Sequence, residues 1–127
     1  MTEYATAVVD FMSAPPLAPA DRPIDVTHLA RMTLGDASLE REVLQLFDRQ
    51  ADMLLARMRK AAPPAAAAHA HTLKGSSRGI GAWGVASAAE AVERAGTRHA
   101  DVEAAIGRLG IAIDEARAVI AELLRAH

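Results

Sequence analysis

The residues best suited to do chemistry in this sequence lie together in the segment His71-Thr72-Leu73-Lys74-Gly75-Ser76-Ser77-Arg78. On a helix with about 3.6 residues per turn, His71, Lys74, Gly75 and Arg78 share one face. We expect that face to be in contact with solvent, because the opposite face carries apolar and small residues that suit a core. These core-facing residues are Ala66, Ala70, Leu73, Ser77 and Ile80.

This face has the components of a phosphoryl-transfer site. A neutral imidazole can attack an electrophilic phosphorus atom, which makes His71 a candidate nucleophile. Lys74 can neutralise the oxygens of a phosphoryl group. Gly75 is costly inside a helix, and its missing side chain would let another protein approach the imidazole. For Arg78 two interpretations stay open, contact with a phosphate or an acidic partner and an ordinary solvated charge.

Helix signals surround this segment and predict an all-α fold. Asp25, Asp36 and Asp101 are suitable N-caps, and Pro63-Pro64 suits a first helical turn. Gly35 is expected to end the first helix, and Gly96 the helix that follows the His71 segment. The spacing of apolar residues predicts a short helix over 26–32 and four longer helices, from 37 to about 62, 64 to 78, 83 or 85 to about 95, and 102 to about 125.

Short connections between long helices predict an antiparallel four-helix bundle, preceded by the short helix. Residues 24–127 form this predicted bundle domain. Residues 1–23 form an N-terminal extension with a Pro-rich linker, because prolines at 15, 16, 19 and 23 interrupt any helix. Residues 2–12 can form a short amphipathic helix, which is either a docking segment or a capping or frayed end.

Composition narrows the functional classes. The chain has 127 residues, which suggests one domain, and no cysteine, which excludes disulfides and thiolate metal sites. Its net charge of −2 is unlike that of a nucleic-acid binder. No apolar run approaches the roughly 18 residues of a membrane span. We therefore expect a cytoplasmic protein that binds neither nucleic acid nor membrane.

The segment from Ala70 to Ser77, together with Ile80-Gly81-Ala82 and Val92-Glu93, resembles the histidine-containing phosphotransfer (Hpt) domain. That family's pattern is His-x-Leu-Lys-Gly-x-small, followed by Gly-Ala and an apolar-Glu pair. The upstream residues Ile24, Asp25, Leu29, Gly35, Asp36, Leu39, Val43, Leu44 and Phe47 are also similar to the family's entry segment, so the resemblance covers roughly 24–95.

The resemblance implies a function and a set of partners. His71 would be the phosphorylated residue, exchanging its phosphoryl group with the aspartate of a response-regulator receiver domain. A hybrid sensor histidine kinase is a further expected partner. No cofactor is expected on this chain, since Mg²⁺ would belong to the receiver. In such domains a polar side chain of the neighbouring helix bonds the other imidazole nitrogen, and Glu93 is the candidate for that role.

The leading interpretation is a monomeric phosphocarrier with no ATP site of its own, because the sequence has no Gly-rich nucleotide-binding loop. Met32 and Thr33, with Arg78, are the expected partner-binding residues. The alternatives are an interaction module whose histidine is never modified, and a fragment of a dimerising kinase.

His69 is a poor rival acceptor, because residues two apart on a helix point about 200° apart. A metal site from the His-x-His spacing would need a strand, which the Ala-rich context disfavours. Glu90 and Glu93 are three residues apart, and a solvating role is favoured over paired acid–base chemistry. His28, His99 and His127 are interpreted as surface or loop residues.

Overall fold

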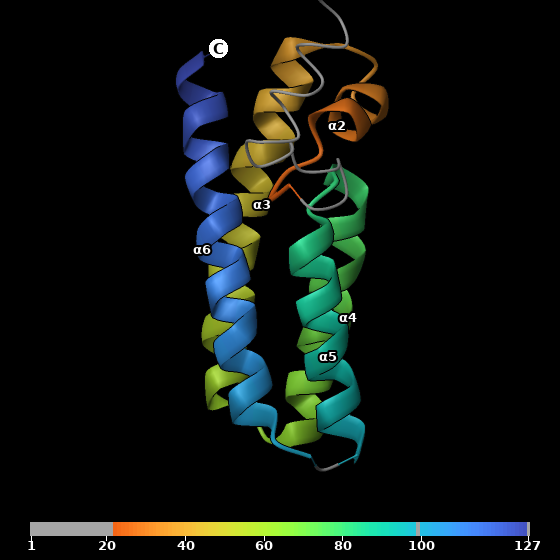
Figure 1. Ribbon diagram of the computed structural model, residues 1–127, viewed down its shortest axis with the longest axis vertical. Helices are drawn as coiled ribbons and strands as arrows, with labels where there is room; N and C mark the ends of the chain where they lie inside the picture. The colour runs from red at the N-terminus through yellow and green to blue at the C-terminus, as the bar shows by residue number, and fades with distance from the viewer. Residues whose placement is uncertain (1–21, 99, 127) are drawn as a thin grey trace, which may run out of the picture.

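Helices dominate the part of the chain that this computed structural model describes, residues 22–98 and 100–126 (Figure 1). They are α2 (Val26–Met32), α3 (Ala37–Lys60), α4 (Pro63–Ile80), α5 (Trp83–Arg98) and α6 (Val102–Ala126), and no strand occurs among these residues. The long helices α3 to α6 run antiparallel as a bundle, and α2 lies at one end of it (Figure 1). The all-α prediction is confirmed. The predicted helix over 2–12, His99 and His127 lie outside the described residues.

Helix starts follow the predicted capping chemistry. The side chains of Asp25, Asp36 and Asp101 each accept a hydrogen bond from the amide three residues further on, at 3.0 to 3.1 Å. These bonds satisfy amides that have no partner within the helix. Pro63 occupies the first position of α4, where a missing amide costs nothing. The helices capped by the three aspartates therefore begin where the sequence predicted, and α4 begins one residue before the predicted 64.

Three helix ends differ from the prediction, and the first is that of α3, which ends at Lys60 instead of about 62. The helix that contains His71 continues to Ile80 instead of ending at 78, and Gly81 ends it with a left-handed φ of 79°. Gly96 does not end α5, which runs on to Arg98. Gly96 is buried, and a Cβ at this position would lie 2.6 Å from the Pro63 carbonyl oxygen. This glycine allows α5 to pack closely against α4. The sequence predicted a helix end here, because glycine is common just after helices.

The core is built largely from small side chains. All five residues predicted for the inner face of α4 are buried, and Ser77 satisfies its hydroxyl by donating to the Leu73 carbonyl at 2.7 Å. Alanines from α3, α4, α5 and α6 alternate with aliphatic residues in the same cluster. Small side chains let helix backbones come close together, so modest apolar volume still excludes water from the bundle centre.

The short helix α2 is held to the α4–α5 turn by polar and aromatic contacts. The Asp25 amide donates to the Gly81 carbonyl at 2.9 Å, and Trp83 Nε1 donates to the Asp25 carboxylate at 3.0 Å. His28 Nε2 bonds the Arg78 carbonyl at 3.0 Å, and its ring lies 4.9 Å from that of Trp83. The interpretation of His28 as a plain surface residue was wrong, because its partners lie on a distant segment of the sequence.

Part of the α3 polar face is also used in packing. Arg117 of α6 donates to Asp48 at 2.7 Å and to Asp52 at 3.3 Å. A carboxylate that accepts from the guanidinium in this way joins two neighbouring helices across the bundle surface. Sequence alone did not distinguish these two aspartates from solvated charges.

We expect Gly96→Ala to destabilise the bundle by about 1–3 kcal/mol, because the added methyl group would meet the Pro63 backbone at 2.6 Å and the Ala67 Cβ at 2.8 Å. Gly107→Ala is the matched control. Gly107 lies in a helix interior where an added methyl group would have no atom within 4 Å, so this change should stabilise by up to about 1 kcal/mol. Urea unfolding of both variants checks the prediction, and equal effects would contradict it.

Candidate functional site

His71 projects from the exposed side of α4, near the middle of the helix. Its side chain is 67 % exposed to solvent. One turn further on, a Cβ at Gly75 would have no atom within 4 Å. Packing therefore gives no reason for a glycine at this position, and the surface beside the imidazole is open to a large partner.

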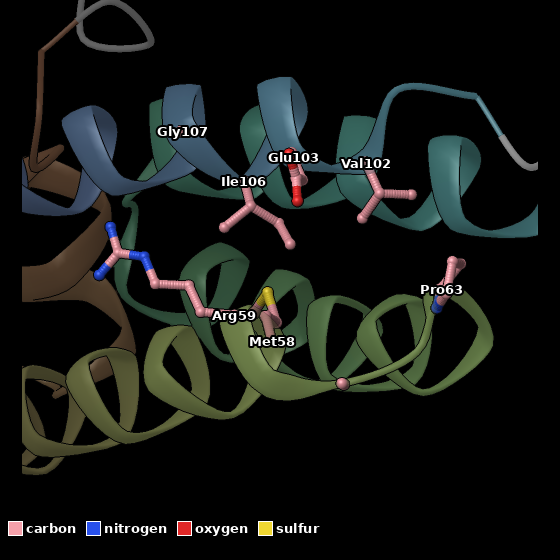
Figure 2. Close-up of a pocket in the computed structure, with 8 residues that line it drawn as sticks. Met58, Arg59, Pro63, Val102, Glu103, Ile106 and Gly107 are labelled. Carbon is pink, nitrogen blue, oxygen red and sulfur yellow. The ribbon is translucent and has the colours of Figure 1, made fainter.

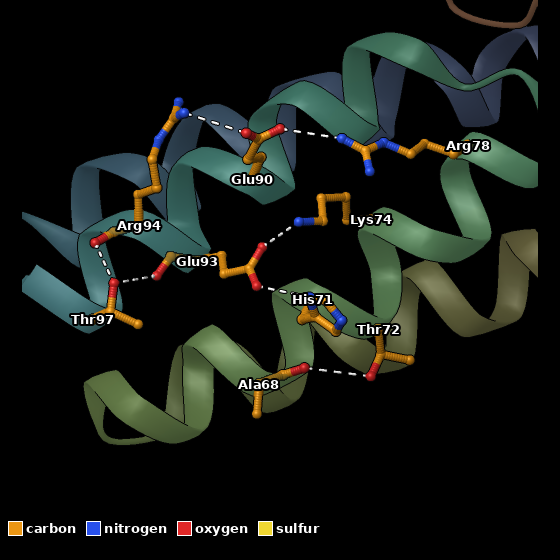
Figure 3. Close-up of polar contacts among 9 residues, drawn as sticks. All are labelled: Ala68, His71, Thr72, Lys74, Arg78, Glu90, Glu93, Arg94 and Thr97. Carbon is orange, nitrogen blue, oxygen red and sulfur yellow. Dashed lines mark hydrogen bonds and ion pairs between the residues drawn. The ribbon is translucent and has the colours of Figure 1, made fainter.

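Glu93 of α5 joins His71 to Lys74 through its two carboxylate oxygens (Figure 3). Oε2 lies 2.7 Å from His71 Nδ1, and Oε1 accepts from Lys74 Nζ at 2.7 Å. The Lys74 side chain is only 16 % exposed, so its ammonium is directed across the helix pair toward the carboxylate. The structure thus brings Glu93 to the imidazole, as the resemblance implied. Lys74, expected to face a phosphoryl group, contacts Glu93 instead.

The protonation of this group follows from its partners. The Lys74 ammonium, and after it the hydrogen bond from His71, lower the pKa of Glu93 below its ordinary value. The carboxylate is therefore ionised at neutral pH and can only accept hydrogen bonds. Consequently His71 Nδ1 must be the donor, and in the neutral ring Nε2 carries the lone pair. Within the described residues Nε2 makes no hydrogen bond, so the lone pair is accessible.

Close packing of α4 and α5 places these groups. Gly96 lies one turn after Glu93, and Ala67 lies one turn before His71. A Cβ on Gly96 would come within 2.8 Å of the Ala67 Cβ, which shows how near the two helices approach there. Because the helices nearly touch at this point, a short glutamate side chain can span from α5 to the imidazole on α4.

A second carboxylate of α5 holds two arginines beside the site. Glu90 accepts from Arg78 of α4 and from Arg94 of α5, both at 3.3 Å (Figure 3). Both arginine side chains remain more than half exposed. Two roles were open for Arg78, and the structure shows its guanidinium in an exposed ion pair. Glu90 and Glu93 are paired with different cations, so they do not form an acid–base pair.

The two expected partner-binding residues at the end of α2 differ in their exposure to solvent. Met32 is exposed and remains available to a partner. Thr33 is 2 % exposed, and its hydroxyl donates to the Leu29 carbonyl at 2.9 Å. Its selection was wrong, because it caps α2 from inside the fold. The neighbouring Leu34, which the sequence did not single out, is 90 % exposed with a left-handed φ of 55°, a conformation that bulky residues seldom adopt.

The surface of residues 22–98 and 100–126 includes two hollows of similar volume. A shallow one of about 360 Å³ lies beside His71 and Glu93 and is also lined by Pro64, Ala67, Ala68 and Thr97. A slightly larger one, about 380 Å³, lies between the end of α3 and the start of α6 (Figure 2). Its lining includes Met58, Arg59, Val102 and Ile106 and has no histidine. Of these two hollows, the smaller adjoins the candidate nucleophile.

His69 is half-buried, whereas His71 is exposed, in keeping with their different directions on α4. Among residues 22–98 and 100–126, no three or more histidines or acidic residues are grouped so as to hold a metal ion. None of the helices described is long and apolar enough to cross a membrane.

Comparison with known proteins identifies the family. Residues 42–126 match the family model of the Hpt domain, a range that contains His71, Lys74, Gly75 and Glu93 and begins within α3. No curated protein and no solved structure matches the chain significantly. Hpt domains are phosphocarrier modules that act with receiver domains and kinases in two-component phosphorelays. Because the match covers well over half of its length, this chain belongs to the Hpt domain family.

Proposed function

We propose that this protein is a phosphorelay intermediate in which His71 accepts a phosphoryl group from a receiver-domain aspartate and passes it to another response regulator. The observation that supports this most strongly is the bond between Glu93 and His71 Nδ1. An ionised carboxylate there holds the hydrogen on Nδ1 and leaves the Nε2 lone pair directed away from α5. His71 is then a nucleophile with one defined reactive atom.

The transfer step needs no base, because no proton leaves the imidazole. The Nε2 lone pair forms the bond to phosphorus while the bond from phosphorus to the aspartate oxygen breaks, and that electron pair leaves with the carboxylate. Nδ1 keeps its hydrogen, so the imidazole ring becomes positively charged. Glu93 lies 2.7 Å from this nitrogen and stabilises the developing charge. The reverse step returns the ring to its neutral form.

Lys74 and Gly75 support this step in different ways. Lys74 keeps Glu93 ionised and directed at the imidazole through its 2.7 Å contact. Gly75 leaves the approach to Nε2 free of side chains. Mg²⁺ would be supplied by the receiver domain, and no cofactor of this chain takes part. Met32 and Arg78 lie on exposed surface and are proposed partner contacts.

The test is incubation of the full chain with a phosphorylated receiver domain, followed by measurement of label on this protein. A label that is lost in acid and retained in base is expected, because a nitrogen–phosphorus bond has that sensitivity. Absence of any label with several receiver domains, together with receiver binding that persists in His71→Ala, would favour the interaction-module alternative. Labelling by ATP alone would favour a kinase fragment.

Substitutions at Gly75 distinguish an effect on stability from an effect on phosphoryl transfer. We expect Gly75→Ala to stabilise the fold by about 1 kcal/mol, because the added methyl group meets no atom and alanine is the better helix former. Gly75→Glu should fold normally and slow transfer at least about tenfold, because a bulky acidic chain would obstruct the partner's acidic site. Thermal melts and transfer rates check both, and unimpaired transfer in Gly75→Glu would contradict the proposed role.

A further inference from the structure

A ridge of exposed apolar side chains runs along α3, on a different helix from the His71 site. Leu39, Leu46 and Met53 are seven residues apart, which is close to two helical turns, so they form one narrow line. Leu46, at its centre, is 58 % exposed. The core contacts of α3 come from other positions, including Leu44, Phe47, Ala51 and Leu54. Bundle packing therefore does not explain this ridge, hereafter the α3 ridge.

One flank of the α3 ridge carries charges of opposite sign. Glu42 and Arg49 are also seven residues apart, and both are exposed. They are too far apart along the helix to pair with each other, since seven residues span about 10 Å. Among the ion pairs of the described residues neither side chain takes part, whereas Asp48 and Asp52 on the α6 side are held by Arg117. Beside the α3 ridge there are thus one acidic and one basic side chain that form no ion pair within the described residues.

This pattern is complementary to itself when two copies are placed antiparallel. A two-fold axis through Leu46 sets Leu39 of one copy opposite Met53 of the other. The same axis keeps the charged flanks of the two copies on one side of the contact. Glu42 of each copy then lies within about one residue's rise of Arg49 of its partner. Two reciprocal ion pairs would then border a continuous apolar contact. A parallel two-fold arrangement would instead put the charged flanks of the two copies on opposite sides of the apolar contact, so Glu42 and Arg49 would form no pairs across it.

We propose that the α3 ridge is a self-association surface through which two copies of this chain form an antiparallel, two-fold dimer. This replaces the monomer expected from the sequence and does not depend on the phosphoacceptor assignment. The contact area offered by three side chains is small, so the dimer is weak and forms reversibly with rising concentration. His71 lies on α4 with its partner Glu93 on α5, so neither residue belongs to the proposed contact.

The test is sedimentation equilibrium of the full chain over a range of concentrations up to submillimolar. The wild type should show a monomer–dimer equilibrium, and Leu46→Glu should be monomeric because it places two carboxylates on the axis. Glu42→Arg and Arg49→Glu should each raise the dimer Kd at least about tenfold, since two attractive pairs become repulsive. The double variant Glu42→Arg/Arg49→Glu restores both pairs and should return the Kd to near the wild-type value.

Ile111→Glu is the matched control, because Ile111 is an exposed apolar residue of α6 outside the ridge. It should leave the dimer Kd unchanged, and circular dichroism melts should show that every variant folds. A wild type that stays monomeric at all concentrations would overturn the proposal. So would dissociation by Ile111→Glu as strong as by Leu46→Glu. Failure of the double variant to recover would overturn the antiparallel pairing.

Discussion

His71→Gln is expected to reduce phosphoryl transfer from a phosphorylated receiver domain to the background level. Glutamine has no nucleophilic nitrogen, while its size and polarity suit the same exposed position on α4. Because the native side chain is 67 % exposed, the free energy of unfolding should change by less than about 0.5 kcal/mol. If transfer is lost while the stability is unchanged, unfolding does not explain the loss, and His71 is the residue that accepts the phosphoryl group.

His69→Gln is the control for this experiment. His69 lies two residues earlier on the same helix and is directed elsewhere, so transfer to this variant should equal that of the wild type. Phosphotransfer kinetics with one receiver domain measure both variants side by side. Equal labelling of wild type and His71→Gln would contradict the assignment, and so would loss of label in His69→Gln alone.

Glu93→Ala is expected to slow transfer about 10- to 100-fold, by analogy with the loss on removing a carboxylate that orients a metal-bound histidine. Two contributions are lost together. The alanine no longer holds the hydrogen on His71 Nδ1, and it no longer stabilises the positive ring that forms when Nε2 binds phosphorus. Lys74 also loses its 2.7 Å partner, so its ammonium has to find solvent.

Glu93→Gln separates the two contributions. Its amide oxygen can still accept from Nδ1 but carries no charge, so a rate between those of wild type and Glu93→Ala is expected. Glu90→Gln is the matched control, because Glu90 is a neighbouring carboxylate of α5 that contacts two arginines and not the imidazole. Single-turnover transfer rates distinguish the variants. A Glu93→Ala rate equal to that of Glu90→Gln would contradict the positioning role.

Helix starts and the inner face of α4 could be predicted because they depend on local chemistry. An aspartate that accepts from the amide three residues ahead stabilises a helix start, and Asp25, Asp36 and Asp101 do so. The periodicity of α4 is likewise a property of the segment alone. The same periodicity put His71 and Gly75 on the exposed side, where the structure has them.

Features that depend on distant segments could not be predicted in this way. Gly96 looks like a helix end, and only the approach of α4 shows why a side chain is excluded there. Thr33 looks like a surface residue, yet its hydroxyl turns back to the Leu29 carbonyl. Lys74 was expected to face a phosphoryl group, and its direction is set by a carboxylate 19 positions later. Charge pairing across helices is decided by packing, which one sequence does not display.

The most direct test of the proposed mechanism is to identify the phosphorylated nitrogen. Protein with ¹⁵N-labelled histidine, phosphorylated by a receiver domain, can be studied by two-dimensional NMR that correlates ring nitrogens with ring protons. We predict a single phosphohistidine at position 71 with phosphorus on Nε2 and hydrogen on Nδ1. Phosphorus on Nδ1, or on any residue other than His71, would contradict the account, because Glu93 occupies the Nδ1 side of the ring.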